Sequence, residues 1–173
     1  MFRNRLGSNY KILEVDSRSE LMKLCKETQA TILDLDIEGE RAYYLIEVQY
    51  HNIERVYGLV SGGHGTQPTV TEIEEQEKVV ISSDNFVYII DLNSQGSIKR
   101  IVCESLVYDI FFVQNNLVLV VCELGARCLS LNGSQIWRYD CDVIIDYTFH
   151  DRCIEIITEN VRTMISLKDG SKI

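Results

Sequence analysis

The chain has 173 residues, of which 46% are hydrophobic and 25% are charged, and its formal net charge is -9. A chain of this size and composition can bury a core of its own, so we expect a single folded domain over residues 1–173. The acidic balance, without any cluster of lysine and arginine, disfavours nucleic acids and anionic membranes as partners.

The N-terminal segment is predicted to be a strand, a helix and a second strand. Tyr10–Val15 reads as the first strand. Ser17 followed by Glu20 has the capping-box spacing, in which each side chain satisfies a backbone N–H at a helix start. An apolar stripe at helical spacing follows, made of Leu21, Leu24 and Cys25. We therefore expect a helix at about residues 18–28 and a new strand from Thr31.

Residues 62–78 separate this N-terminal segment, 1–61, from the rest of the chain. Closely spaced glycines and Pro68 predict a loop. An acidic run follows, made of Glu72, Glu74, Glu75 and Glu77. We expect this run to be an exposed edge strand, whose charges discourage the addition of another strand.

A repeat runs through residues 79–173. Each copy has an apolar strand, a polar break, a second strand that ends in leucine, and a glycine turn. The leucines are Leu92, Leu131 and Leu167, spaced by 39 (131 - 92) and 36 (167 - 131) residues, and the glycines are Gly96, Gly133 and Gly170. Periods of this size are typical of repeat architectures. A weaker copy runs from Ile46 to Leu59.

The middle copy resembles a β-propeller blade, in particular the quinoprotein-like kind. The resemblance rests on Ser130–Trp137, where a Leu-Asn corner, a glycine and a tryptophan close the unit, and it covers roughly residues 70–173. It implies a mainly β fold of antiparallel meanders, with a two-sheet β-sandwich as the alternative. Such blades usually close into larger rings. An open stack of blades, a sandwich and a ring completed by oligomerisation all remain open, and no cofactor residue carries over.

No motif predicts a cofactor or metal. Asp34–Glu40 resembles a calcium loop, but Leu45 stands where a bidentate glutamate is needed. Gly62–Thr66 lacks the Gly-Lys-Ser/Thr of a phosphate-binding loop. The histidines are isolated in the sequence: His51, His64 and His150.

The cysteines and the apolar runs indicate in which cellular compartment the protein is expected. Six cysteines lack Cys-x-x-Cys spacing and lie mostly among apolar residues, which predicts buried, reduced thiols. Neither a signal-peptide pattern nor the ~20 apolar residues that span a bilayer is seen. We therefore expect a cytoplasmic protein.

Aromatic and acidic residues suggest a surface for another protein. The candidate interaction surface consists of Tyr43, Tyr44, Tyr50, Tyr57, Glu72, Glu74, Glu75, Glu77 and Trp137. We expect a non-catalytic interaction module that binds another protein. If the partner contacts the acidic run, we expect that partner to be basic. An immunity-type neutraliser of a toxin fits by analogy. The alternatives are a hydrolase or ligand-binding enzyme with a loop-built site, and a structural subunit of a homo-oligomer.

Overall fold

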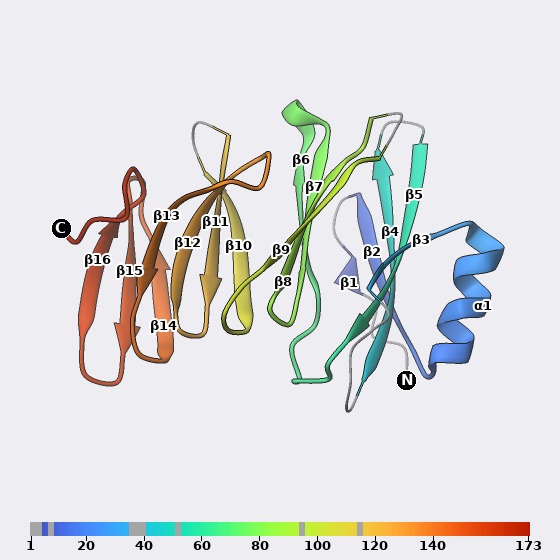
Figure 1. The fold of residues 1–173 in the computed structure, drawn as a ribbon, viewed down its shortest axis with the longest axis horizontal. Helices are drawn as coiled ribbons and strands as arrows, with labels where there is room; N and C mark the ends of the chain where they lie inside the picture. The colour runs from blue at the N-terminus through green and yellow to red at the C-terminus, as the bar shows by residue number, and fades with distance from the viewer. Residues whose placement is uncertain (1–4, 7–8, 35–40, 51–52, 94–95, 114–115) are drawn as a thin grey trace. The chain divides into compact units, whose positions relative to one another are not determined.

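The computed structural model describes residues 5–6, 9–34, 41–50, 53–93, 96–113 and 116–173 (Figure 1). The chain divides into two compact units, Met1–Pro68 and Thr69–Ile173. The fold is mainly β, as predicted, with one α-helix among these described ranges. No helix in them is both long enough and apolar enough to cross a membrane.

The first unit is a five-stranded sheet in the order β1-β2-β4-β5-β3. Its strands are β1 (Arg5–Leu6), β2 (Tyr10–Val15), β3 (Thr31–Asp34), β4 (Ala42–Tyr50) and β5 (Ile53–Ser61). β3 runs parallel to β5, whereas the other neighbours are antiparallel. β4 and β5 pair as an antiparallel hairpin, like the second and third strands of each repeat copy, but they lie in a mixed sheet. The weak copy from Ile46 to Leu59 therefore stays a prediction.

The predicted helix is present as α1, Arg18–Thr28. The backbone N–H of Glu20 donates to Ser17 Oγ at 3.2 Å, and Glu20 Oε2 accepts from the N–H of Asp16 at 3.2 Å. Cys25 lies on the buried side of the helix and faces Gly58 of β5, where an added Cβ would lie 2.4 Å from Cys25 Sγ. A glycine at this position lets the helix approach the sheet closely.

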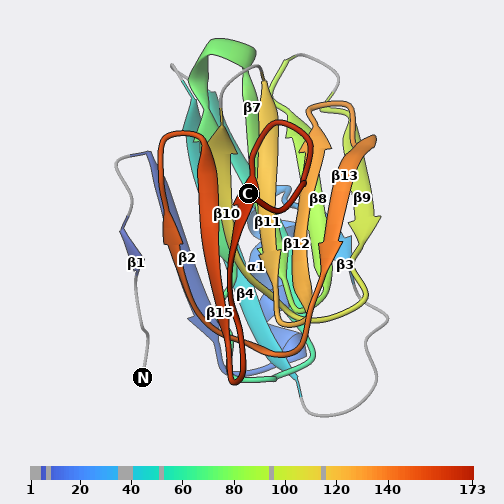
Figure 2. The same ribbon diagram turned by 90° about the vertical axis from the view of Figure 1, so that its left-hand side faces the viewer.

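The second unit contains three antiparallel sheets, each built from strands in chain order. The first sheet has β6 (Thr69–Ile73), β7 (Lys78–Ser83), β8 (Phe86–Asp91) and β9 (Ile98–Val102). The second has β10 (Val107–Val113), β11 (Leu117–Cys122), β12 (Gly125–Ser130) and β13 (Gln135–Asp140). The third has β14 (Ile144–Phe149), β15 (Cys153–Thr158) and β16 (Arg162–Ser166), and it faces the viewer in Figure 2.

The three predicted leucine corners occupy equivalent places in these sheets. Each follows the third strand of its sheet and leads to a glycine with positive φ: Gly96 (55°), Gly133 (82°) and Gly170 (72°). The N–H of Leu92 donates to Glu77 O and that of Leu167 to Arg152 O, in each case the residue before the second strand. The repeat predicted from the sequence is confirmed by these matching positions.

Consecutive sheets are also linked by matching hydrogen bonds. Asp84 O, in the β7–β8 turn of the first sheet, accepts from the N–H of Val107, the first residue of β10. In the same way, Glu123 O of the β11–β12 turn accepts from the N–H of Ile144, the first residue of β14. One apolar core lies between the first and second sheets and another between the second and third. The second unit is therefore a stack of equivalent sheets.

Candidate functional site

The four tyrosines of the predicted interaction surface lie on β4 and β5. Tyr43 packs against the apolar cluster that includes α1 residues. Tyr44 and Tyr57 are each 4% exposed and lie on the other face of the sheet. Tyr50, at the end of β4, is half-buried. These tyrosines therefore do not gather on one open face of the described structure.

Trp137 also differs from the expectation, because it lies in the core between the second and third sheets. Its side chain is 7% exposed, and its indole Nε1–H donates to Leu167 O at 3.0 Å. The ring covers Gly170, where an added Cβ would lie 2.8 Å from Trp137 Cε3. Its contacts join two sheets instead of facing a partner.

The acidic run lies at the turn between β6 and β7. Glu74 and Glu75 are exposed on a short 3-10 helix, η1 (Glu74–Gln76), whereas Glu72 and Glu77 are half-buried. The N–H of Glu77 donates to Glu74 O and closes the turn. The prediction that the whole run is an edge strand is therefore wrong after β6, which ends at Ile73.

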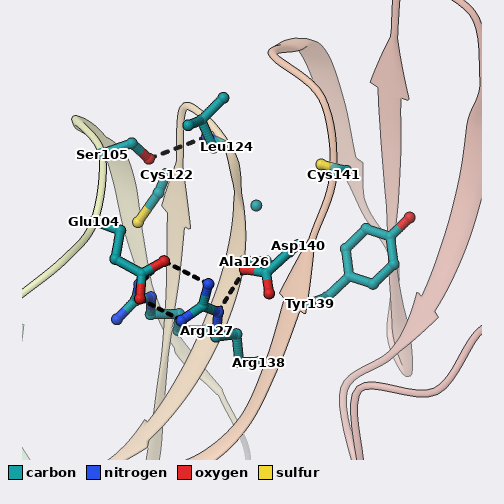
Figure 3. Close-up of a pocket in the computed structure, with 11 residues that line it drawn as sticks. Glu104, Ser105, Cys122, Leu124, Ala126, Arg127, Arg138, Tyr139, Asp140 and Cys141 are labelled. Carbon is teal, nitrogen blue, oxygen red and sulfur yellow. Dashed lines mark hydrogen bonds and ion pairs between the residues drawn. The ribbon is translucent and has the colours of Figure 1, made fainter.

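A charged pocket of about 260 Å³ opens between the loop after β9 and the ends of β12 and β13 (Figure 3). Arg138 contacts both carboxylate oxygens of Glu104. Arg127, whose side chain is 12% exposed, places Nη2 3.5 Å from Glu104 Oε2. Arg138 also pairs with Asp140. Two guanidinium groups and two carboxylates thus neutralise one another.

Glu104 is expected to stabilise the fold by separating two like charges, since Arg127 and Arg138 are direct cross-strand neighbours. We expect Glu104→Ala to lower the free energy of unfolding by about 1 kcal/mol at low salt. The difference should shrink at high salt, because both guanidinium groups reach solvent. Urea denaturation at two salt concentrations measures it. Glu159→Ala, which removes an exposed glutamate from the β15–β16 turn, is the control. Equal stability of the two variants would contradict this role.

The charged pocket offers no activated nucleophile. The hydrogen bond with Cys103, together with burial, raises the pKa of Cys122, and burial raises that of Cys141. Both side chains are therefore neutral thiols near pH 7. His64 and His150 are exposed and line neither this pocket nor the larger one below. The loop-built enzyme site considered from the sequence gains no support from these residues.

The other sequence candidates for chemistry also gain no support. No group of three histidine, cysteine or acidic side chains is placed to hold a metal ion in the described part of the chain. His51 and all of the calcium-like stretch except Asp34 lie outside the described residues. Gly62–Thr66 is described, and no helix follows it before β6.

A larger pocket of about 770 Å³ lies between the second and third sheets, and we call it the apolar pocket because six of its ten lining residues are apolar. Its lining residues are Phe112, Val113, Leu117, Phe149, Asp151, Arg152, Ser166, Leu167, Lys168 and Ile173. Phe112 and Phe149 remain 39% and 40% exposed. Phe149 is held in place by stacking on Phe111, with 5.1 Å between the ring centroids. Exposed aromatic rings beside a cavity are typical of protein-binding surfaces.

The turn between β6 and β7 lies at the same end of the second unit as the last residues of β10 and β14 (Figure 1). The lining of the apolar pocket includes residues from the ends of β10 and β14, so the pocket lies at this end too. We call this surface the hairpin end and define it by Glu74, Glu75, Phe112, Phe149 and Arg152. Sequence reasoning missed both phenylalanines. The sequence did hold one sign of their shared role. Both phenylalanines stand near the end of the first strand of a repeat copy, 37 residues apart (149 - 112).

The outer face of the third sheet carries an ion pair at a place where the matching face of the second sheet is apolar. Glu155 and Arg162 stand 36 residues after Leu119 and Ala126, and their side chains lie 3.4 Å apart as an ion pair. Thr148 is the cross-strand partner of Glu155, whereas Phe111 is that of Leu119. Half-buried Ile157 and Met164 lie on the same outer face, so this face is mixed in polarity.

No protein-family model and no curated protein matches the chain. Among solved structures, the chain is similar to the crystal structure of HIRA(644-1017), with a TM-score of 0.50 and 5% sequence identity over 100% of this chain and 52% of that one. The chain thus spans about half the length of that structure, and the likeness concerns the fold alone. With the repeated antiparallel sheets, it supports the propeller-like reading. Neither finding tests the narrower quinoprotein-like resemblance.

Proposed function

We propose that the chain is a non-catalytic protein-binding module and that the hairpin end is its binding surface. The observation that carries the proposal is the pair of exposed phenylalanines, Phe112 and Phe149, beside an apolar pocket of about 770 Å³. Leaving two large aromatic rings in water costs free energy that a partner recovers by covering them. The repeated β architecture supports the proposal at a coarser level, because it offers broad faces without convergent catalytic groups.

The acidic turn supports a partner with a basic group placed beside η1, where Glu74 and Glu75 are exposed. Arg152 and Lys168 line the apolar pocket and would repel a basic group placed there, so the pocket suits the partner's apolar anchor. Rim charges of this kind steer association and select partners more than they add affinity. An immunity-type neutraliser of a basic toxin, acting in the cytoplasm, is the finer form of the proposal. It is supported only by the chain's small size and its net charge of -9.

The apolar part is tested by Phe149→Ser with Ile145→Ser as the matched control. Ile145 lies on the same strand, is 65% exposed, and does not line the pocket. In affinity capture from the cells that produce the protein, the proposed partner should be retained by the wild type and by Ile145→Ser. Its affinity for Phe149→Ser should fall about tenfold or more. Equal binding of the two variants, both folded by circular dichroism, would contradict the proposal.

The acidic part is tested separately by reversing charge on the turn. The double variant Glu74→Lys and Glu75→Lys should slow association with a basic partner, and the effect should weaken as salt increases. Stopped-flow or surface-binding kinetics with the captured partner measures the rate. Glu159→Lys, which reverses one charge on an exposed turn elsewhere and so makes half of this charge change, is the control. An unchanged association rate in the double variant would contradict the proposal of a basic partner. It would not bear on the proposal that the phenylalanines bind a partner.

A further inference from the structure

Two cysteine thiols contact each other at the junction of the first and second sheets. Cys103 directly follows β9, and its N–H donates to Asn85 O at 2.7 Å, which continues the pairing of β8 with β9 in the first sheet. Cys122 is the last residue of β11 in the second sheet. Both residues belong to the apolar core between these sheets, and their thiols are hydrogen-bonded to each other. A covalent bond between the two sulfurs would therefore join two sheets.

The repeat offers a comparison at the junction of the second and third sheets. Cys141 directly follows β13 there, as Cys103 follows β9. Thr158 is the last residue of β15, as Cys122 is the last residue of β11. Cys141 and Thr158 line one cavity of about 400 Å³. At these equivalent places the second junction thus has one thiol and one hydroxyl, whereas the first junction has two thiols.

The contact makes Cys103 the member of the pair that ionises first. The hydrogen bond with Cys122 lowers the pKa of Cys103 below its ordinary value, and the charge of Arg127 acts in the same direction. Burial and Glu104 oppose this shift without reversing it. The same hydrogen bond raises the pKa of Cys122, which stays a thiol. At the equivalent place in the next junction, burial raises the pKa of Cys141.

The charged pocket gives a small oxidant a route to this pair. Cys122 lines the pocket, together with Glu104 and Ser105, which directly follow Cys103 (Figure 3). Water takes about 30 Å³ of liquid volume, so a pocket of about 260 Å³ has room for hydrogen peroxide. Cys103 lies outside the lining and is 1% exposed, so we expect its sulfur to react slowly, through local opening, and only with small molecules.

We propose that Cys103 and Cys122 are a redox-sensitive pair that a peroxide converts into a disulfide bond between the first and second sheets. Disulfides that form in a reducing compartment are usually transient and redox-sensing, and a thiol reductant would restore this pair. The site lies apart from the phenylalanines and the acidic turn of the hairpin end, and the proposal does not depend on partner binding there.

The reaction balances with one peroxide for each disulfide. The Cys103 thiolate bonds to one peroxide oxygen while the O–O bond breaks, which gives a sulfenic acid and, after protonation of the leaving oxygen, one water. The Cys122 sulfur then gives up its proton and displaces the hydroxyl group of the sulfenic acid, so that the S–S bond forms and a second water leaves. The two sulfurs lose two electrons, and the peroxide gains them.

Mass spectrometry of the whole chain after treatment with hydrogen peroxide tests the proposal. Trypsin cuts after Arg100 and Arg127, and the peptide between these cuts, residues 101–127, contains Cys103 and Cys122 and no other cysteine. When thiols are alkylated in denaturant before digestion, we expect this peptide to carry no alkyl group and to be two hydrogens lighter. Treatment with dithiothreitol before alkylation should restore both alkylation sites.

Two other tryptic peptides serve as internal controls. Residues 139–152 contain Cys141 as their single cysteine, which should stay alkylated at the same peroxide dose. Met22 is 39% exposed, and its conversion to the sulfoxide shows that the dose was effective. The wild-type measurement requires no variant to fold.

Two variants separate this pair from general oxidation. In Cys103→Ala the partner thiol is gone, so Cys122 should stay alkylated at the dose that protects it in the wild type. Cys141→Ala removes the equivalent cysteine of the next junction and should form the same disulfide as the wild type. Equal loss of alkylation at Cys122 in Cys103→Ala would overturn the proposal.

Three outcomes in the wild type would also overturn it. The first is full alkylation of Cys103 and Cys122 at a dose that oxidises Met22. The second is sulfinic or sulfonic acid at either cysteine without the disulfide. The third is a disulfide between two copies of the chain, which appears as a covalent dimer in the absence of reductant.

Discussion

Replacing Trp137 by alanine is expected to lower the free energy of unfolding by about 3–5 kcal/mol. The side chain is 7% exposed, packs among the apolar residues between the second and third sheets, and donates a hydrogen bond to Leu167 O. Its removal leaves a cavity against Gly170 and an unpaired carbonyl oxygen. Urea or guanidinium denaturation followed by circular dichroism measures the loss.

The control is the neighbouring exposed residue. Ile136 is 51% exposed on the same strand, and Ile136→Ala should change stability by no more than about 0.5 kcal/mol. If Trp137→Ala were as stable as Ile136→Ala, the ring would not join the two sheets and would again be a candidate for a partner surface.

Substituting alanine at the repeat glycines is expected to give graded losses of stability. Gly96, Gly133 and Gly170 all have positive φ. An alanine at such a position should lower the free energy of unfolding by about 1 kcal/mol, because a residue with a Cβ is strained in the left-handed conformation. At Gly96 the new Cβ meets no atom within 4 Å. At Gly170 it lies 2.8 Å from the indole of Trp137, so the total loss should reach roughly 2–4 kcal/mol.

Gly133 should give an intermediate loss, because its new Cβ would lie 2.6 Å from Cγ of Lys99, part of a side chain that can move away. Thermal and chemical denaturation of the three variants tests the order Gly96, Gly133, Gly170. Equal losses at all three would show that backbone conformation alone matters. The contacts between neighbouring sheets would then contribute nothing at these corners.

Local signals predicted the local parts of the fold. Ser17 and Glu20 were sufficient for the start of α1, because both partners of the capping box lie within one turn. The leucine–glycine corners indicated the repeat for a similar reason. The parallel pairing of β3 with β5 was not predicted, since those partners are distant in sequence. Nor do the residues Glu74–Gln76 distinguish a 3-10 turn from a strand end.

The candidate site was harder to predict, because exposure depends on which sheets pack together. From the sequence, Trp137 looks like an aromatic residue of an interface. The structure buries its ring against Gly170, which lies 33 residues later (170 - 137). Phe112 and Phe149 read as ordinary strand residues, and only the stacking of two sheets leaves their rings at the mouth of a pocket. Of the acidic residues, Glu74 and Glu75 lie on an exposed turn at that same end.

Residue-resolved amide hydrogen exchange tests most directly the claim that the second unit is a stack of equivalent, linked sheets. The informative amides are those of Val107 and Ile144, which begin β10 and β14 and donate to Asp84 O and Glu123 O in turns of the preceding sheet. We predict that both exchange as slowly as strand amides such as that of Val120. Exchange of both at the rate of exposed loops, with the strands still protected, would contradict the stacked arrangement on which the binding surfaces depend.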